Sequence, residues 1–228
     1  MGTLSAPLAG AFQRSSAVAA ISTGIVPVPR FSTVAVTAMQ GRPVGTAVIQ
    51  LHSSSADVVR HAAEAPPCAG PYDSVPFDMG VTGRDLRVVD AAYTGDSDAP
   101  VGPPVIDAWV RFRSVPEDPA LHAALLAQFA GHMPIAAALR PHAGIGQDQA
   151  HRTISTAINA ISLSMHAEAR ADRWMRYHHL STFAGDGMTH AECRVYDEPG
   201  TLLASFTVEA MVRPFAPTMG TVDDRYAL

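Results

Sequence analysis

One stretch with helical spacing, residues 114–142, constrains the fold more than any other part of the chain. Asp118 is suited to be an N-cap, and Pro119 suits the first helical position, where its missing N–H leaves no hydrogen bond unmade. Gly131 is the residue type favoured in the left-handed conformation just after a helix. We therefore predict a single helix of about three turns that ends at Gly131.

The apolar residues of this helix are spaced for one buried face. Leu121, Leu125 and Phe129 recur at four-residue intervals, which predicts that they form the stripe in contact with the core. The flanking segments have strand patterns, so this is the helix around which an antiparallel sheet is expected to curve. One helix among several long antiparallel strands predicts an α+β fold.

Runs of β-branched residues predict the strands. Residues 31–39 and 44–54 read as a hairpin with its turn at 40–43, and residues 57–65 continue as either a third strand or a short helix. Later strands are predicted at 86–93, 105–113, 153–166, 174–184, 189–197 and 202–215.

The strand at 105–113 alternates clearly. One side carries apolar residues and the other carries Trp109 among charged residues, which predicts a half-exposed strand with Trp109 on its wetter side. The predicted core side consists of Ile106, Ala108, Val110 and Phe112, and the wetter side of Asp107, Trp109, Arg111 and Arg113.

Residues 66–83 contain four prolines, three glycines and no periodicity, which is typical of a linker. We accordingly predict four parts of the chain. They are an N-terminal part at 1–65, the linker at 66–83, a second domain at 84–216 and a tail at 217–228.

Charge and cysteine content exclude several classes of partner. The net charge is −5 and the 16 basic residues are scattered, which argues against nucleic-acid binding. Cys68 and Cys193 are too few for a disulfide framework or a zinc site. The adjacent His178 and His179 would point to opposite faces of a strand, which argues against their binding one metal ion together. No apolar run is long enough for a membrane span. We predict a cytoplasmic protein without a membrane partner, metal or cofactor.

Several motifs, in order, resemble the acyl-CoA thioesterase II family. They are AWVRFR at 108–113, SVPEDPALHAALL at 114–126, ALRPH at 138–142, His166 eight residues before Trp174, and GTLLASFTVEAMVRPF at 200–215. The resemblance implies a double hot-dog, in which antiparallel sheets wrap around a central helix in two fused copies. The first copy is expected to be incomplete, because little of the chain precedes the region that matches its end. A homodimer is also expected from the resemblance.

The same resemblance implies a catalytic apparatus that this chain lacks in part. The family hydrolyses acyl-CoA with an Asp at the end of the second helix, a Thr on the next strand and a Gln on the last strand. Here the Asp position falls on Gly131 and the Gln position on Val208, while Asn159 is the only polar side chain in the window of the Thr. Loss of one polarising donor typically slows such a reaction by about 100- to 1000-fold. Hydrolysis by the family route is therefore predicted to be impaired.

Three residues are candidates for a substitute catalytic site. His132 is either a general base at the helix end or a histidine favoured there by the helix dipole. Asn159 either donates to a carbonyl oxygen or satisfies a backbone group. Glu209 is the third candidate. Strand alternation places its side chain on the face of the sheet away from Val208, so the alternative is that Glu209 only lies on a solvated face.

We predict an acyl-thioester-handling hot-dog protein that acts on acyl-CoA or acyl-carrier-protein thioesters. Hydrolysis is either impaired or carried by His132 and Asn159. The alternatives are an enzyme repurposed for a polyketide-like intermediate in a biosynthetic pathway, as a cyclase, dehydratase or isomerase, and a binding protein without catalysis.

Overall fold

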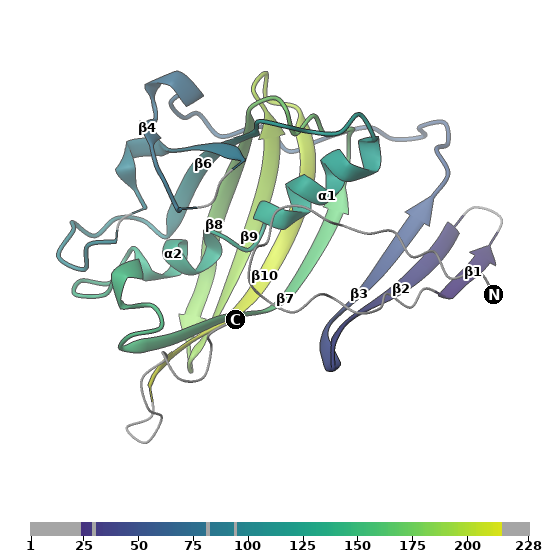
Figure 1. The fold of residues 1–228 in the computed structure, drawn as a ribbon. Coiled ribbons are helices and arrows are strands. Elements are labelled where there is room, and N and C mark those ends of the chain that lie inside the picture. Colours follow the sequence, from purple (N-terminus) through teal and green to yellow (C-terminus); the bar gives the residue numbers. More distant parts are fainter. Residues whose placement is uncertain (1–23, 29–30, 81–82, 94, 216–228) are drawn as a thin grey trace. The chain divides into compact units, whose positions relative to one another are not determined.

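The computed structural model describes residues 24–28, 31–80, 83–93 and 95–215 (Figure 1). The described residues up to His61 form one compact unit and those from Ala62 form a second. The four-part division predicted from the sequence stays a prediction.

The first unit contains a three-stranded antiparallel sheet, β1 (Gly24–Val28), β2 (Phe31–Gln40) and β3 (Arg42–His52), in that order. The predicted hairpin is confirmed, and its turn residue Gly41 has a φ of 68°, which glycine adopts without strain. The strand or helix expected at 57–65 is absent, so that prediction is wrong. Val58 is 98% exposed, so burial of its side chain does not stabilise a regular element at this position.

The second unit is built on a seven-stranded sheet in the order β4-β5-β6-β8-β9-β10-β7, in which every neighbouring pair is antiparallel. β7 is therefore an edge strand. Three 3-10 turns, η1 (Pro71–Asp73), η2 (Val89–Ala91) and η3 (Gln147–Gln149), lie between the longer elements. The strands are β4 (Val75–Pro76), β5 (Arg84–Val88), β6 (Val105–Phe112), β7 (Ile154–Met165), β8 (Met175–Gly185), β9 (Met188–Asp197) and β10 (Leu202–Pro214).

The predicted helix is α1 (Pro119–Phe129), which lies across one face of this sheet (Figure 1). Its predicted start is confirmed, because the Asp118 side chain accepts a hydrogen bond of 2.9 Å from the Ala120 N–H. The predicted left-handed cap at Gly131 is wrong. The chain instead stays right-handed at Ala130 and continues through a turn into a second, unpredicted helix, α2 (Pro134–Leu139).

The buried face of α1 differs from the predicted one. Leu121 is 38% exposed and Leu125 is half-buried, whereas His122, Leu126 and Phe129 are buried. His122 belongs to this face because its Nδ1 accepts a hydrogen bond of 3.0 Å from the Ala171 N–H. The helix is thus rotated so that a polar residue with a buried partner replaces a leucine.

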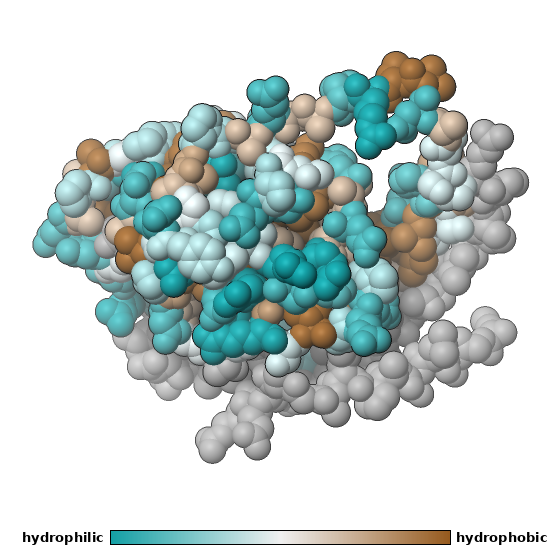
Figure 2. All heavy atoms as spheres, turned by 90° about the horizontal axis from the view of Figure 1, so that it is seen from above, coloured by the Kyte–Doolittle hydropathy of each residue, from teal (hydrophilic) through white to brown (hydrophobic). Residues whose placement is uncertain are grey.

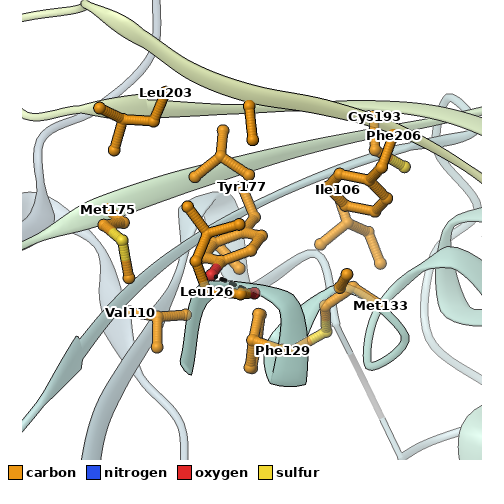
Figure 3. Packing of buried hydrophobic residues seen from close by; sticks show 14 of the residues in the cluster. Ile106, Val110, Leu126, Phe129, Met133, Met175, Tyr177, Cys193, Leu203 and Phe206 are labelled. Carbon is orange, nitrogen blue, oxygen red and sulfur yellow. Dashed lines mark hydrogen bonds between the residues drawn. The ribbon is translucent and has the colours of Figure 1, made fainter. Parts of the chain in front are cut away.

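The main core lies between the two helices and the sheet (Figure 3). Tyr177 of β8 reaches from the sheet to α1, where its hydroxyl donates to the Leu126 carbonyl at 2.9 Å, the dashed line in Figure 3. The predicted core side of β6 is confirmed, since Ile106, Ala108, Val110 and Phe112 are all buried in this core.

The expected exposure of Trp109 is wrong. Its side chain is 4% exposed and packs with Val89 and Trp174 in a second, smaller cluster on the other face of the sheet. Its Nε1–H donates to the Ala69 carbonyl at 3.0 Å, because residues before β4 cover this face. Strand alternation identifies two faces but does not show which of them other parts of the chain will cover.

The described helices are all too short or too polar to cross a membrane. One face of the molecule is shown in Figure 2, where hydrophilic residues surround several separate apolar areas.

Candidate functional site

His132 lies in the turn between α1 and α2, where its ring contacts Phe129 and Arg84. Its ring stacks on Phe129 with centroids 4.7 Å apart and an angle of 7° between the planes. Its Nδ1 lies 3.2 Å from the Phe129 carbonyl, and its Nε2 lies 3.3 Å from an Arg84 guanidinium nitrogen. Guanidinium only donates, so Nε2 must accept and Nδ1 must carry the proton that is donated to the carbonyl.

Arg84 begins β5 on the side that faces the core, like Leu86 and Val88. The residue is only 6% exposed, and its guanidinium carbon lies 5.0 Å from the centre of the Phe129 ring. Two further acceptors lie at the limit of hydrogen bonding, Gln128 Oε1 at 3.5 Å and Met79 Sδ at 3.7 Å. We call Arg84, Met79, Gln128, Phe129 and His132 the Arg84 cluster.

No carboxylate forms an ion pair with Arg84 in the part of the chain that the structure describes. Burial lowers the pKa of Arg84 from its ordinary value, although the guanidinium keeps its charge near neutral pH. Burial, and then the charge of Arg84, lower the pKa of His132. The cluster at neutral pH is therefore a cation beside a neutral imidazole whose lone pair already accepts a hydrogen bond. This arrangement can polarise a carbonyl oxygen, but His132 is not free to act as a base.

Gly131 faces β7. A Cβ atom at this position would lie 3.5 Å from Ile158 Cγ1 and 3.5 Å from Ile161 Cδ1, which is ordinary van der Waals contact. Asn159 is the extra residue of a β-bulge, because Ile158 pairs with Ala210 whereas Ala160 pairs with Glu209. The turn after α1 therefore contacts β7 through Gly131 and Ile158. His132 is the neighbour of Gly131 in the chain, and the exposed Asn159 is the neighbour of Ile158.

Glu209 does not face the turn after α1. It is exposed on β10, level with His190 of β9 and Ala160 of β7, while its neighbour Val208 is buried in the core. The alternation expected for these two residues is observed. Glu209 therefore lies on the sheet face turned away from the core.

A second arginine–histidine group lies on the sheet face opposite the helices. Asp107 Oδ1 accepts hydrogen bonds from Arg176 Nε at 2.9 Å and from His178 Nδ1 at 3.0 Å, and all three side chains are largely buried. Burial raises the pKa of Asp107, but these hydrogen bonds outweigh it and leave the pKa below its usual value. We call these three residues the Asp107 cluster.

The next residue, His179, faces the core. Its Nδ1 lies 3.3 Å from the Ile106 carbonyl, and its Nε2 has no hydrogen-bond partner among the residues that the structure describes. Burial lowers the pKa of His179 to about 4. Neighbouring histidines thus point to opposite faces, and no group of three His, Cys, Asp or Glu side chains suited to a metal occurs among the described residues.

Sequence reasoning missed Arg84. A signal for it was present, because Arg84, Leu86 and Val88 alternate in register with an apolar core face. A charged residue at the end of such a face is exceptional, since an arginine is rarely buried without a partner.

Comparison with known proteins gives consistent results. Residues 61–212 match the family profile described as the acyl-CoA thioesterase C-terminal domain. Among solved structures, an acyl-CoA thioesterase II from Mycobacterium marinum is similar, with a TM-score of 0.71 and 21% identity over 86% of this chain and 73% of the other. A tesB protein from Mycobacterium avium subspecies paratuberculosis has a TM-score of 0.68 and 19% identity, with coverage of 86% and 71%.

A hot-dog protein of unknown function from Alicyclobacillus acidocaldarius is also similar, with a TM-score of 0.62 and 17% identity over 86% of this chain and 74% of the other. No curated protein matches the chain. At such low identities the solved structures establish the fold alone. They confirm the predicted α+β double hot-dog.

Proposed function

Because the chain belongs to the acyl-CoA thioesterase C-terminal domain family, we propose that it handles acyl thioesters and that hydrolysis by the family route is impaired. The observation that carries the proposal is the Arg84 cluster. In it a buried cation contacts a hydrogen-bonded neutral histidine, and this histidine is the next residue in the chain after Gly131, the position at which the resemblance implies a carboxylate. The thioester carrier is either CoA or an acyl carrier protein.

The impairment follows from what the relevant side chains can do. Gly131 has no group that accepts a proton, and Val208 is packed in the core at the position that the resemblance assigns to Gln. His132 would serve as a base only after its Nε2 left Arg84. A water near the thioester would therefore lack a free base, and general-base catalysis typically contributes about 100- to 10,000-fold to a rate.

Binding, by contrast, has suitable groups. The exposed Asn159 amide can donate to the thioester carbonyl oxygen near the end of α1, and the Arg84 guanidinium can donate to a further oxygen atom of the same ligand. Two apolar side chains of β7 lie next to Gly131, the half-buried Ile158 and the exposed Ile161. We propose that Arg84, His132 and Asn159 surround the thioester, and that Glu209 takes no part.

One observation favours a second candidate function. A fixed cation beside a neutral imidazole stabilises negative charge, and enolate-like charge develops in isomerisation, dehydration and cyclisation of acyl intermediates. An enzyme repurposed for such a step on a polyketide-like intermediate in biosynthesis is therefore the alternative. Mass spectrometry of 3-oxoacyl and 3-hydroxyacyl thioesters after incubation would distinguish it, because a rearranged or dehydrated thioester would appear without release of thiol.

Assembly and location are proposed from the resemblance and from composition. A cytoplasmic homodimer is expected, and light scattering of the purified chain would test the dimer. A monomer at micromolar concentration would contradict it.

The central test combines equilibrium binding with thiol release on a panel of acyl-CoAs. We expect saturable binding, together with thiol release at least about 100-fold slower than that of a family member that keeps the acid, Thr and Gln. Asn159→Ala should weaken binding several-fold, and Glu209→Gln, which changes an exposed residue on the neighbouring strand, should leave it unchanged. Absence of binding to every acyl-CoA, or hydrolysis as fast as that of the intact relative, would refute the proposal.

A further inference from the structure

Arg84 is a buried cation for which the described residues provide no opposite charge. The other similarly buried arginine, Arg176, has the Asp107 carboxylate 2.9 Å from its Nε. Removing a charge from water is strongly unfavourable unless a partner compensates it. A bound ligand can supply the missing partner.

The present partners of the guanidinium are weak and can be displaced. Gln128 Oε1 and Met79 Sδ lie at 3.5 and 3.7 Å, and neither atom is charged. Gln128 is exposed and Met79 is half-buried, so both side chains have room to move. Their departure would leave N–H groups in the fork geometry that matches the two oxygens of a carboxylate.

The position of the cluster indicates where such a carboxylate would lie on the ligand. His132 adjoins Gly131, the point at which the proposed function places the thioester carbonyl. A carboxylate bound by Arg84 would then be only a few bonds away from the thioester carbon. Long uncharged acyl chains would not provide a group for this cation.

We propose that the acyl group of the natural ligand carries its own carboxylate and that Arg84 binds it, so that the preferred ligands are thioesters of short dicarboxylic acids. This inference rests on the proposed handling of acyl thioesters. His132 acts as a positioning residue, because its Nε2 orients one guanidinium nitrogen.

The test is isothermal titration of the full chain with matched pairs of CoA thioesters, malonyl against propionyl and glutaryl against pentanoyl. In each pair the carboxylated ligand should bind roughly tenfold tighter or more, as expected for a charge-assisted bidentate contact. Equal or weaker binding of the carboxylated ligands, with the uncharged ligands still bound, would overturn this inference and leave the proposed function intact. Failure of all four ligands to bind would overturn both.

Variants identify the responsible cation. Arg84→Met should abolish the difference within each pair, whereas Arg87→Met, which removes a cation from the same strand, should preserve it. A preference that survives in folded Arg84→Met would refute the role of Arg84. Arg84→Lys provides a second variant in case the methionine variant does not fold. It keeps the charge but not the fork, and should reduce the preference several-fold.

Discussion

The two arginine–histidine clusters on opposite faces of one sheet differ in whether a carboxylate lies between the arginine and the histidine. The Asp107 cluster joins Arg176 and His178 through a carboxylate, whereas the Arg84 cluster joins an arginine directly to His132. Both arginines are almost fully removed from solvent. The charge of the arginine is thus compensated by a carboxylate in one cluster, whereas the described residues provide no opposite charge in the other.

This difference separates a structural role from a binding role. In the Asp107 cluster a carboxylate compensates the charge of Arg176, although Arg176 Nη2 has no hydrogen-bond partner among the described residues, and loss of that carboxylate would leave the buried charge uncompensated. A buried cation with only neutral, distant acceptors retains the capacity to bind an anion. The four experiments below test this distinction, from the largest expected effect to the smallest.

Asp107→Asn should convert the complete cluster into an incomplete one. It leaves Arg176 buried without a negative partner, and we expect the free energy of unfolding to fall by about 3 to 5 kcal/mol. Asp85→Asn is the control, since Asp85 pairs with Arg111 and Arg113 nearer the surface and should cost less than about 1 kcal/mol. Urea unfolding at neutral pH measures both. Equal losses in the two variants would contradict the distinction.

The free energy of unfolding should fall at acid pH, because the pKa of His179 is lowered in the folded state. His179 has a pKa near 6.5 when unfolded and about 4 when folded, so its contribution is complete above pH 6.5. As the pH falls from 6.5 towards 4, the unfolded chain binds a proton that the folded chain does not, and stability should fall by about 3 kcal/mol. The lowered pKa of His132 acts in the same direction.

Urea unfolding across this range, repeated with His179→Leu, isolates the effect. The variant should lose most of the dependence on pH between 6.5 and 4. A parallel decline in both proteins would show that His179 titrates normally in the folded state.

Gly131→Asp should introduce a carboxylate at the position where the resemblance implies the acid of the family. The position has room for a Cβ, and its φ lies outside the left-handed region, so the variant should fold. We expect thiol release to rise about tenfold, because a carboxylate near the helix end can activate water. Gly131→Asn, of equal size and without charge, is the matched control. A similar rise in both variants would exclude the carboxylate as the cause.

Replacement of each arginine by methionine should give unequal effects on stability. Arg176→Met leaves the buried Asp107 carboxylate without the arginine that compensates its charge, and should be strongly destabilising. Arg84→Met removes a charge for which the described residues supply no opposite charge. The gain should offset the lost contact with Phe129 and leave the free energy of unfolding within about 1 kcal/mol of the original. A large loss in Arg84→Met would indicate a hidden partner for this cation.

The sequence by itself determined the features that depend on neighbouring residues. Asp118 and Pro119 located the start of α1, and alternation located the core side of β6. The order of several motifs resembled that of the acyl-CoA thioesterase II family, and this resemblance implied the hot-dog fold and the absence of an acid at Gly131. These signals are local, because caps, strand alternation and residue identity do not depend on what lies across the core.

Only the tertiary structure decided what covers each surface. It buried His122 instead of Leu121, enclosed Trp109, and placed Glu209 away from the end of α1. Above all it brought Arg84 of β5 within 3.3 Å of His132, 48 residues later in the chain. Such contacts depend on how a helix is rotated over a sheet, which is set by the packing of many distant side chains and not by the spacing within one element.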